Sequence, residues 1–497
     1  MERVRRQFLF GDLFAISSAL LLGGGAVLLL LWSGYIAQAQ RPGDQAVLAT
    51  GLQPSIVRDI NPGPPDALPS NLAGLNGWLY FAATDGISGT ELWKSDGTGA
   101  GTVLVKDIHP AGSANPTALT VVSDTLFFAA SDGISGTELW KSDGTGAGTS
   151  LVKDIHPGGD ANPTLLFDVK GTLFFFATDG SSGYELWQSD GTDAGTTLVK
   201  DINTGGDSIL PAHLRTGVMA EMDGKLYFVA TDGAKGYELW VSDGTGPGTA
   251  MVKDIASDAY PSLPAYLVNV SGTLFFSAGD LGSGRELWMS NGLAGGTTMV
   301  KNIHPSGDAS PRYLIGVGGT VFFNATDGIS GTELWQSDGT MTGTVLVKDI
   351  NTAGNADPGW LTEMSGTLFF AADDGSRGRE LWVSDGTASG TARVKDINTT
   401  AALGGSANPK YVLDAGGILF FQAYNGDDGA ELWRSDGTDE GTLLYDLCSG
   451  ISGSEPEALT LVGDVVFFRA KCGSQGSELW ALPLRARVYL PVVLRNH

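Results

Sequence analysis

The sequence predicts an all-β fold: a β-propeller of nine four-stranded antiparallel blades, whose ring is closed by the N-terminal strand. Three observations predict it. The tripeptide Glu-Leu-Trp recurs nine times, at intervals of 47, 47, 53, 48, 47, 47, 51 and 47 residues. Each interval holds four short strand-like runs separated by Ser-Asp, Asp-Gly and Ser-Asp-Gly-Thr turns. Finally, the first unit has a strand too many and the last has one too few.

The N-terminal segment has the pattern of an export signal. The basic start "MERVRR" precedes an apolar run from Leu13 to Trp32, and Ala37 and Ala39 form an A-x-A cleavage site. The run is long enough to span a bilayer, so an uncleaved anchor is the alternative. Arg5-Arg6-Gln-Phe-Leu keeps the twin-arginine route open. We expect a cleaved signal over 1–39, a linker over 40–54, the propeller over 55–482 and a tail over 483–497.

Each repeat unit reads as four strands, named a to d in chain order. In the second unit, "ALTVV" is strand a, "TLFFAA" is strand b and "ELWKS" is strand c, while "TVLVKDI" is the strand d that ends the preceding unit. Gly supplies positive φ in the connecting turns, and Asp caps its own turn. No segment after Trp32 has a sustained helical period.

The two ends of the repeat array complement each other. The first strand, "SIVRDI" from Ser55 to Ile60, is a strand d with no a, b or c before it. The last unit has "LTLVG", "VVFFRA" and "SELWAL" but no "LVKDI" after them. We therefore expect the N-terminal strand to complete the last blade, which removes the exposed edges of an open stack.

The recurring tryptophan is expected to pack between neighbouring blades. These residues are Trp93, Trp140, Trp187, Trp240, Trp288, Trp335, Trp382, Trp433 and Trp480.

The strand c–d hairpin also predicts a charge pair. A register in which Trp93 faces Leu104 brings Glu91 opposite Lys106, an opposed charge pair across the strands. The same register would pair Arg58 on the first strand with Glu478 in the last unit. Unit eight departs from the pattern, with Tyr445 at the lysine position.

The two cysteines fall in neighbouring loops of one rim. Cys448 follows strand d of its unit, and Cys472 lies in the next b–c turn. In an exported chain this placement favours a disulfide, with two unpaired thiols as the alternative.

The other units hold a polar pair where the cysteines lie. A hydrogen bond that joins the two loops is the expected role, and metal binding is disfavoured because two ligands per blade are too few and Asn replaces His. The pairs are Asn61 with Asp85, His109 with Asp132, His156 with Asp179, Asn203 with Asp232, His304 with Asp327, and Asn351 with Asp374.

The Asp-Gly-Thr turns place one carboxylate per blade on the opposite rim. Turn capping explains these residues, although so acidic a surface leaves room for weak calcium binding. They are Asp96, Asp143, Asp190, Asp243, Asp338, Asp385 and Asp436, with Asn291 in the fifth unit.

The composition excludes some partners. Thirty basic residues against 55 acidic ones give a net charge of −25, which argues against nucleic acid and anionic membranes. No catalytic triad or G-x-S-x-G motif is present. The arginines are spread over different units, so no arginine cluster is expected. They include Arg215, Arg285, Arg312, Arg377 and Arg379.

The motif "ELWKSDGT" and its variants "ELWVSDGT" and "ELWRSDGT" resemble the ELWxxDGT-repeat, or hyalin-like, proteins of bacteria, from Ser55 to Trp480. The fifth unit departs from the motif with "ELWMSNGL". That family implies an exported or surface protein with no established shared activity. "AATDGISGTELW" is also similar to the tryptophan-docking motif of quinoprotein propellers, but this chain lacks their adjacent cysteine pair.

Together these observations predict an exported, non-catalytic scaffold, secreted or at the cell surface, that binds an extracellular protein or glycan. We expect a monomer without cofactor and with no membrane contact after signal cleavage. The alternatives are an extracellular enzyme, quinoprotein-like or glycan-active, and a subunit that docks a partner. The enzyme would use the irregular loops of units four and seven, 208–217 and 399–408, for which neutral drift is the competing explanation.

Overall fold

The computed structural model describes residues 52–63, 66–209, 217–257, 259–399, 405–450 and 452–485. The predicted signal, most of the linker and most of the tail lie outside these ranges, as do residues 210–216 and 400–404 of the irregular loops. No helix among the described residues is long and apolar enough to cross a membrane.

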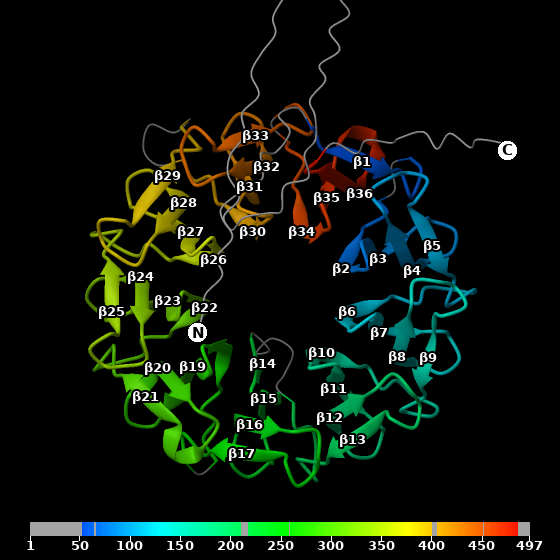
Figure 1. Ribbon diagram of the computed structural model, residues 1–497, viewed down its shortest axis with the longest axis horizontal. Helices are drawn as coiled ribbons and strands as arrows, with labels where there is room; N and C mark the ends of the chain where they lie inside the picture. Colours follow the sequence, from blue (N-terminus) through cyan, green and yellow to red (C-terminus); the bar gives the residue numbers. More distant parts are fainter. Residues whose placement is uncertain are drawn as a thin grey trace, which may run out of the picture. The chain divides into compact units, whose positions relative to one another are not determined.

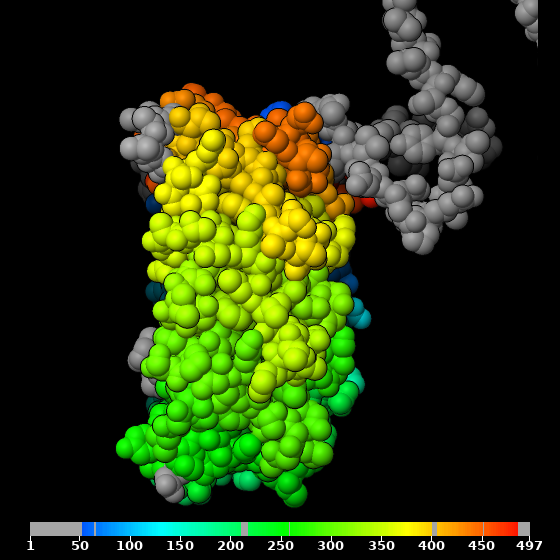
Figure 2. Space-filling view, turned by 90° about the vertical axis from the view of Figure 1, so that its left-hand side faces the viewer, coloured from blue at the N-terminus to red at the C-terminus, as the bar shows by residue number. Residues whose placement is uncertain are grey.

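The described chain forms nine four-stranded antiparallel sheets, which confirms the predicted propeller. The sheets follow one another around a ring in chain order (Figure 1). Figure 2 shows the outer wall of the ring, where the blades succeed one another from green to orange. Apart from two 3-10 turns, Ala294–Gly296 and Gly473–Gln475, every regular element of the described residues is a strand.

The strands a line the central opening of the ring (Figure 1). They are β2(Ser70–Leu75), β6(Thr117–Val122), β10(Thr164–Val169), β14(Met219–Met222), β18(Ala265–Val270), β22(Arg312–Val317), β26(Gly359–Met364), β30(Lys410–Asp414) and β34(Glu457–Val462). The strands b lie next to them. They are β3(Trp78–Thr84), β7(Thr125–Ser131), β11(Thr172–Thr178), β15(Lys225–Ala230), β19(Thr273–Asp280), β23(Thr320–Thr326), β27(Thr367–Asp373), β31(Leu419–Tyr424) and β35(Val465–Lys471).

The strands c carry the Glu-Leu-Trp motif. They are β4(Thr90–Ser95), β8(Thr137–Ser142), β12(Tyr184–Ser189), β16(Glu238–Ser242), β20(Gly284–Ser290), β24(Thr332–Ser337), β28(Arg379–Ser384), β32(Ala430–Ser435) and β36(Ser477–Pro483). The strands d form the outer edge. They are β5(Val103–Lys106), β9(Ser150–Lys153), β13(Thr197–Lys200), β17(Ala250–Lys253), β21(Thr298–Lys301), β25(Val345–Lys348), β29(Ala392–Lys395), β33(Leu443–Tyr445) and, in blade nine, β1(Ser55–Arg58).

The ring closes as predicted. Strand β1 pairs antiparallel with β36, so the first described strand completes the last blade. Across this joint, Trp93 of blade one packs in one cluster with Val465 and Phe467 of blade nine. The same contact recurs between other blades, since Trp140 of blade two packs against Tyr80 and Leu92 of blade one. The predicted role of the tryptophans between blades is therefore confirmed.

The predicted charge pairs are wrong because the pairing of strands c and d contains a bulge in every blade except blade eight. Trp93 does face Leu104, but the register shifts before the next pair, so that Lys106 lies opposite Leu92 rather than Glu91. In the closing hairpin, a bulge likewise places Arg58 opposite Leu479. A bulge adds one residue on one strand and moves every later side chain along the partner.

The lysines and the glutamates instead have separate contacts: the lysines with the next blade, and the glutamates with backbone N–H groups. Lys106 Nζ donates to the carbonyl of Thr149 in the next blade at 2.7 Å and lies 5.9 Å from the ring of Trp140. Arg58 makes the equivalent contacts across the closure, with Thr102 O at 2.7 Å and the ring of Trp93 at 6.0 Å. The cation on strand d thus holds the next blade through a carbonyl and an aromatic face.

Candidate functional site

The glutamate of each Glu-Leu-Trp motif is a buried structural acceptor. Glu91 is fully buried, and its carboxylate accepts the backbone N–H groups of Ile108 at 2.8 Å and Ala114 at 2.9 Å. Glu478 accepts those of Ile60 and Ala67 at the closure. Burial raises the pKa of Glu138 to about 7, against the opposing effect of its backbone hydrogen bonds. These carboxylates hold the loop between strand d and the next strand a.

The predicted His–Asp loop pairs meet by packing rather than by the expected hydrogen bond. His109 Nδ1 lies 3.1 Å from Ser113 O, while the Asp132 carboxylate accepts N–H groups of Ile134 and Ser135. The imidazole lies against Gly133, where an added β-carbon would come within 2.2 Å of His109 Nε2.

The other two histidine pairs repeat this arrangement. An added β-carbon would lie 2.2 Å from Nε2 of His156 at Gly180 and 2.2 Å from that of His304 at Gly328. Asp179 and Asp327 likewise accept backbone N–H groups of their own turns. These six predicted residues therefore tie neighbouring loops together, and each histidine ring reaches the turn of its partner aspartate.

The Asp-Gly-Thr turns are capped as predicted. Asp143 Oδ1 accepts both the backbone N–H and the hydroxyl of Thr145, each at 2.8 Å. These hydrogen bonds lower the pKa of Asp143, so the carboxylate is held as an anion. Within the described ranges, no group of three or more His, Cys, Asp or Glu side chains is arranged to hold a metal ion.

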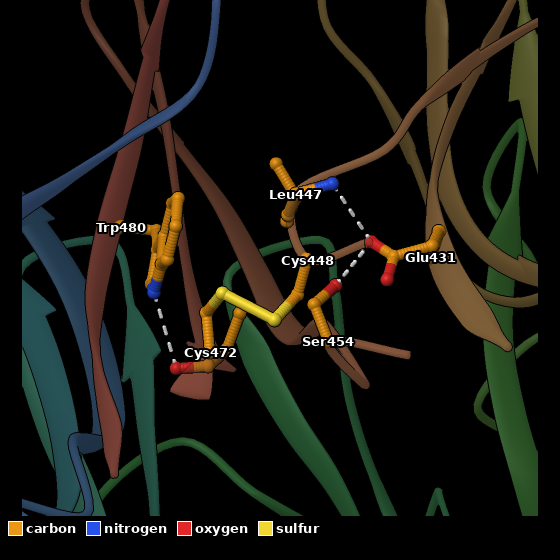
Figure 3. The surroundings of a disulfide bond; sticks show 7 residues. Glu431, Leu447, Cys448, Ser454, Cys472 and Trp480 are labelled. Atoms are coloured by element: carbon orange, nitrogen blue, oxygen red, sulfur yellow. Dashed lines mark hydrogen bonds between the residues drawn. A yellow bond between two sulfur atoms is a disulfide. The ribbon is translucent and has the colours of Figure 1, made fainter. Parts of the chain in front are cut away.

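The predicted disulfide joins Cys448 to Cys472, with 5.3 Å between the Cα atoms. Figure 3 shows that it links the loop after strand d of blade eight to the b–c turn of blade nine. Beside it, Glu431 accepts the N–H of Leu447. The covalent link occupies the place of the histidine contact in other blades.

A feature that the sequence analysis missed lies at the inner edge of the rim that carries the b–c turns. The second residue of strand a is aromatic in four consecutive blades, five to eight: Tyr266, Tyr313, Trp360 and Tyr411. We call these four residues the aromatic arc. Blades one, two, three and nine carry Asn71, Ala118, Leu165 and Ala458 at the same position.

The backbone projects this residue out of the ladder. Each strand of the arc has a register shift directly after its first pair, as between Arg312 and Ile315 in β22. The arc residues have φ between 54° and 57°, a left-handed conformation that bulky residues rarely adopt. Ala118 has the same φ of 54°, so the bulge belongs to the repeat and only the side chain differs.

The arc presents aromatic surface to solvent. Tyr313 is 47% exposed and Trp360 is 42% exposed, which is unusual for such large apolar groups on an inner strand. The rings form neighbouring pairs: Tyr266 and Tyr313 have centroids 5.7 Å apart, and Trp360 and Tyr411 have centroids 5.1 Å apart. Both pairs are tilted, so the rings do not cover each other's faces.

Arginines also gather along the arc, which corrects the expectation of scattered residues. Arg285, Arg312 and Arg379 belong to blades five, six and seven, which are neighbours in the ring. Arg285 Nη2 donates to Leu263 O at 2.9 Å, and Arg379 Nη1 donates to Asp357 O at 2.6 Å. Arg215 lies outside the described residues, and Arg377 is bound to Asp396 at 2.7 Å.

A separate hollow of about 600 Å³ opens on the same rim, over blades two to four. Its wall includes Tyr184, Tyr237 and Asp207, with Thr117 and Thr137 on the side of blade two. Tyr237 donates its hydroxyl to Ile209 O at 3.3 Å, and Asp207 accepts the N–H of Tyr184 at 2.9 Å. Some polar groups of this hollow therefore already form hydrogen bonds with the loop that precedes strand a of blade four.

Comparison with known proteins adds little beyond the fold. No protein-family model and no curated protein matches the chain. Solved structures that resemble it include one of two prolyl endopeptidases (TM-score 0.40, 14% identity, 64% of this chain and 49% of that one) and a puromycin hydrolase (0.37, 13%, 84% and 60%). Prolyl oligopeptidase B from Galerina marginata is another (0.38, 11%, 76% and 55%).

The chain covers between 49% and 60% of the length of those proteins. Likenesses at these scores carry no conclusion about activity, partner or substrate.

Proposed function

We propose that this chain is an exported, non-catalytic scaffold that binds an extracellular partner through the aromatic arc. The observation that carries the proposal is the asymmetry of the ring. Four consecutive blades place large aromatic side chains, of which Tyr313 and Trp360 are close to half exposed, at a position where four of the other blades have Asn, Ala or Leu. Exposed aromatic groups with adaptable polar neighbours are typical of binding surfaces.

The polar groups elsewhere support a scaffold. The glutamates, the histidines of the loop pairs and the turn aspartates form their hydrogen bonds within their own or an adjoining loop, mostly with backbone groups. The disulfide fits an oxidising compartment, where such bonds persist. Export through the N-terminal signal is part of this proposal.

The test compares binding by the chain with binding by a variant whose arc copies the other blades. The substitutions Tyr313→Asn and Trp360→Ala use residues that Asn71 and Ala118 already place at this left-handed position. We therefore expect the variant to fold normally. Labelled protein would be added to cells and extracellular polymer of the producing organism, and the retained fraction measured.

We expect retention by the unaltered chain and loss of most retention by the arc variant. Met341→Ala provides the matched control, because Met341 is 67% exposed in a c–d turn on the opposite rim and its loss should change nothing. Equal retention of all three proteins would refute the role of the arc. Hydrolysis or oxidation of the bound material would instead favour the alternative, an extracellular enzyme.

A further inference from the structure

We infer that the aromatic arc binds an acidic polysaccharide, a sugar chain that carries carboxylates. This inference rests on the proposed function and names the chemistry of its ligand. It arises from the placement of cations along the arc, in a chain whose net charge is −25.

Each blade of the arc contributes one cation at its inner rim. Two positions supply them: the residue before the arc residue, which is Arg312 in blade six and Lys410 in blade eight, and the first residue before the Glu-Leu-Trp motif, which is Arg285 in blade five and Arg379 in blade seven. Elsewhere these two positions hold no cation in the described chain. Their occupants are Ser70, Thr90, Thr117, Thr137, Thr164, Tyr184, Tyr237, Glu457 and Ser477.

Two of the four cations are free to meet a ligand. Arg312 and Lys410 are exposed, and neither forms an ion pair within the described ranges. Each directly precedes an arc residue, Tyr313 or Tyr411, so charge and aromatic surface alternate along the inner edge.

The other two cations support the aromatic rings. Arg379 lies across Gly359, where an added β-carbon would come within 2.9 Å of its Nη2 and 3.8 Å of Tyr313 Cε2. Arg285 lies close enough to Tyr266 to oppose the rise in the tyrosine pKa that burial causes. Both guanidinium groups are anchored on backbone carbonyls, so they keep their charge near the rings.

Carboxylates lie on this rim as well. Glu457 is bound by Arg469 at 2.5 Å, and Asp308 accepts the N–H of Arg285 at 2.8 Å. Asp357 is exposed beside Arg379 and offsets part of its charge. Asp373 also acts on the charge of Arg379. The charge that no described ion pair offsets is therefore that of Arg312 and Lys410, which attract an anion locally on a strongly acidic molecule.

The combination favours a sugar chain over other polyanions. Pyranose rings present apolar C–H faces that stack on exposed aromatic rings, while the carboxylates of a polyuronate pair with cations spaced along the chain. A single-stranded nucleic acid is a polyanion whose bases also stack on aromatic rings, with one phosphate for every 3.4 Å or so of strand. Single-stranded DNA is therefore a control in the test.

The test measures binding of the full exported chain to defined polymers by titration calorimetry. The probes are polygalacturonate and alginate, with dextran and pullulan as neutral polymers and oligo-dT and polyglutamate as non-sugar polyanions. The charge variant is Arg312→Ser with Lys410→Ser, which copies Ser70 of blade one. Trp360→Ala removes stacking and keeps the charges.

We expect binding to the polyuronates, weakened about tenfold by the charge variant and further by raised salt. Trp360→Ala should weaken it at low and high salt alike. Unfolding midpoints equal to that of the unaltered chain would show that both variants are folded.

Lack of polyuronate binding, equal affinity for dextran, or preference for oligo-dT or polyglutamate would overturn the inference. If a neutral polymer binds and only Trp360→Ala abolishes it, the ligand class is wrong but the proposed function stands. If the arc variants change neither polymer binding nor retention on extracellular material, the proposed function fails as well.

Discussion

The substitution Glu333→Gln tests whether the motif glutamate stabilises the blade as a buried acceptor. Glu333 is fully buried in blade six, and its carboxylate accepts the backbone N–H groups of Ile350 at 2.8 Å, Ala356 at 3.0 Å and Asn351 at 3.4 Å. Glutamine keeps one acceptor oxygen and turns an NH₂ donor toward the remaining N–H groups. At least one buried donor then loses its partner.

An unsatisfied buried donor costs about 1–3 kcal/mol, so we expect Glu333→Gln to lower the free energy of unfolding by that amount. Glu333→Ala leaves every donor unpaired and should cost more. Glu440→Gln is the control, because Glu440 is exposed and forms no hydrogen bond in the described part of the chain.

Urea unfolding followed by tryptophan fluorescence measures the three variants. The expected order of stability is Glu440→Gln, then Glu333→Gln, then Glu333→Ala. If Glu333→Gln unfolds at the same urea concentration as the unaltered chain, the glutamate does not act as an acceptor and the reasoning fails.

Three further predictions follow from the repeat. Burial raises the pKa of the motif glutamate to about 7 in six of the nine blades, so between about pH 4.5 and 7 the folded chain binds more protons than the unfolded one. The free energy of unfolding should therefore fall as the pH rises through this window; urea midpoints at pH 5 and pH 7.5 check it, and a higher midpoint at pH 7.5 would contradict it. The double change Cys448→Ser and Cys472→Ser opens a loop with a sequence separation of 24 residues and should cost about 3 kcal/mol, measured by thermal unfolding against the unaltered chain under oxidising conditions; an unchanged midpoint would show that the bond adds no stability. Gly133→Ala forces a β-carbon against His109 at φ 78° and should cost about 1–3 kcal/mol, whereas Gly295→Ala meets nothing within 4 Å and should be neutral by the same assay; equal midpoints for the two would remove the packing argument.

The ring could be predicted from the sequence because the pattern repeats. Glu-Leu-Trp fixes strand c in every unit, and the unpaired run from Ser55 to Ile60 reveals the closure without any long-range information. The disulfide could be predicted from the same comparison of units, because Cys448 and Cys472 stand at the two loop positions that hold a polar pair in other units. Nine similar copies of one four-strand repeat are compatible with few other topologies.

The details of the hairpins could not be predicted in the same way. The register between strands c and d shifts between Leu92 and Trp93, so that Lys106 pairs with Leu92. The sequence contains no pattern that predicts such a bulge. The glutamate then faces backbone N–H groups and the lysine faces the next blade. Both contacts join segments that only the folded ring brings together.

The aromatic arc was open to prediction but was missed. Its residues stand at 47- and 51-residue intervals, directly after Ala265, Arg312, Gly359 and Lys410, and comparing this one position across the units reveals them. Arginines that are far apart along the chain become neighbours because consecutive blades adjoin. In the ring, equivalent positions of consecutive repeats lie side by side, so residues about 47 positions apart in the sequence become neighbours.

Hydrogen–deuterium exchange of the full chain, with and without bound extracellular polymer, tests the central claim most directly. If the arc is the binding surface, protection on binding will concentrate at the starts of β18, β22, β26 and β30 and at the loops that enter them. Protection on the opposite rim, or spread evenly over all nine blades, would contradict it.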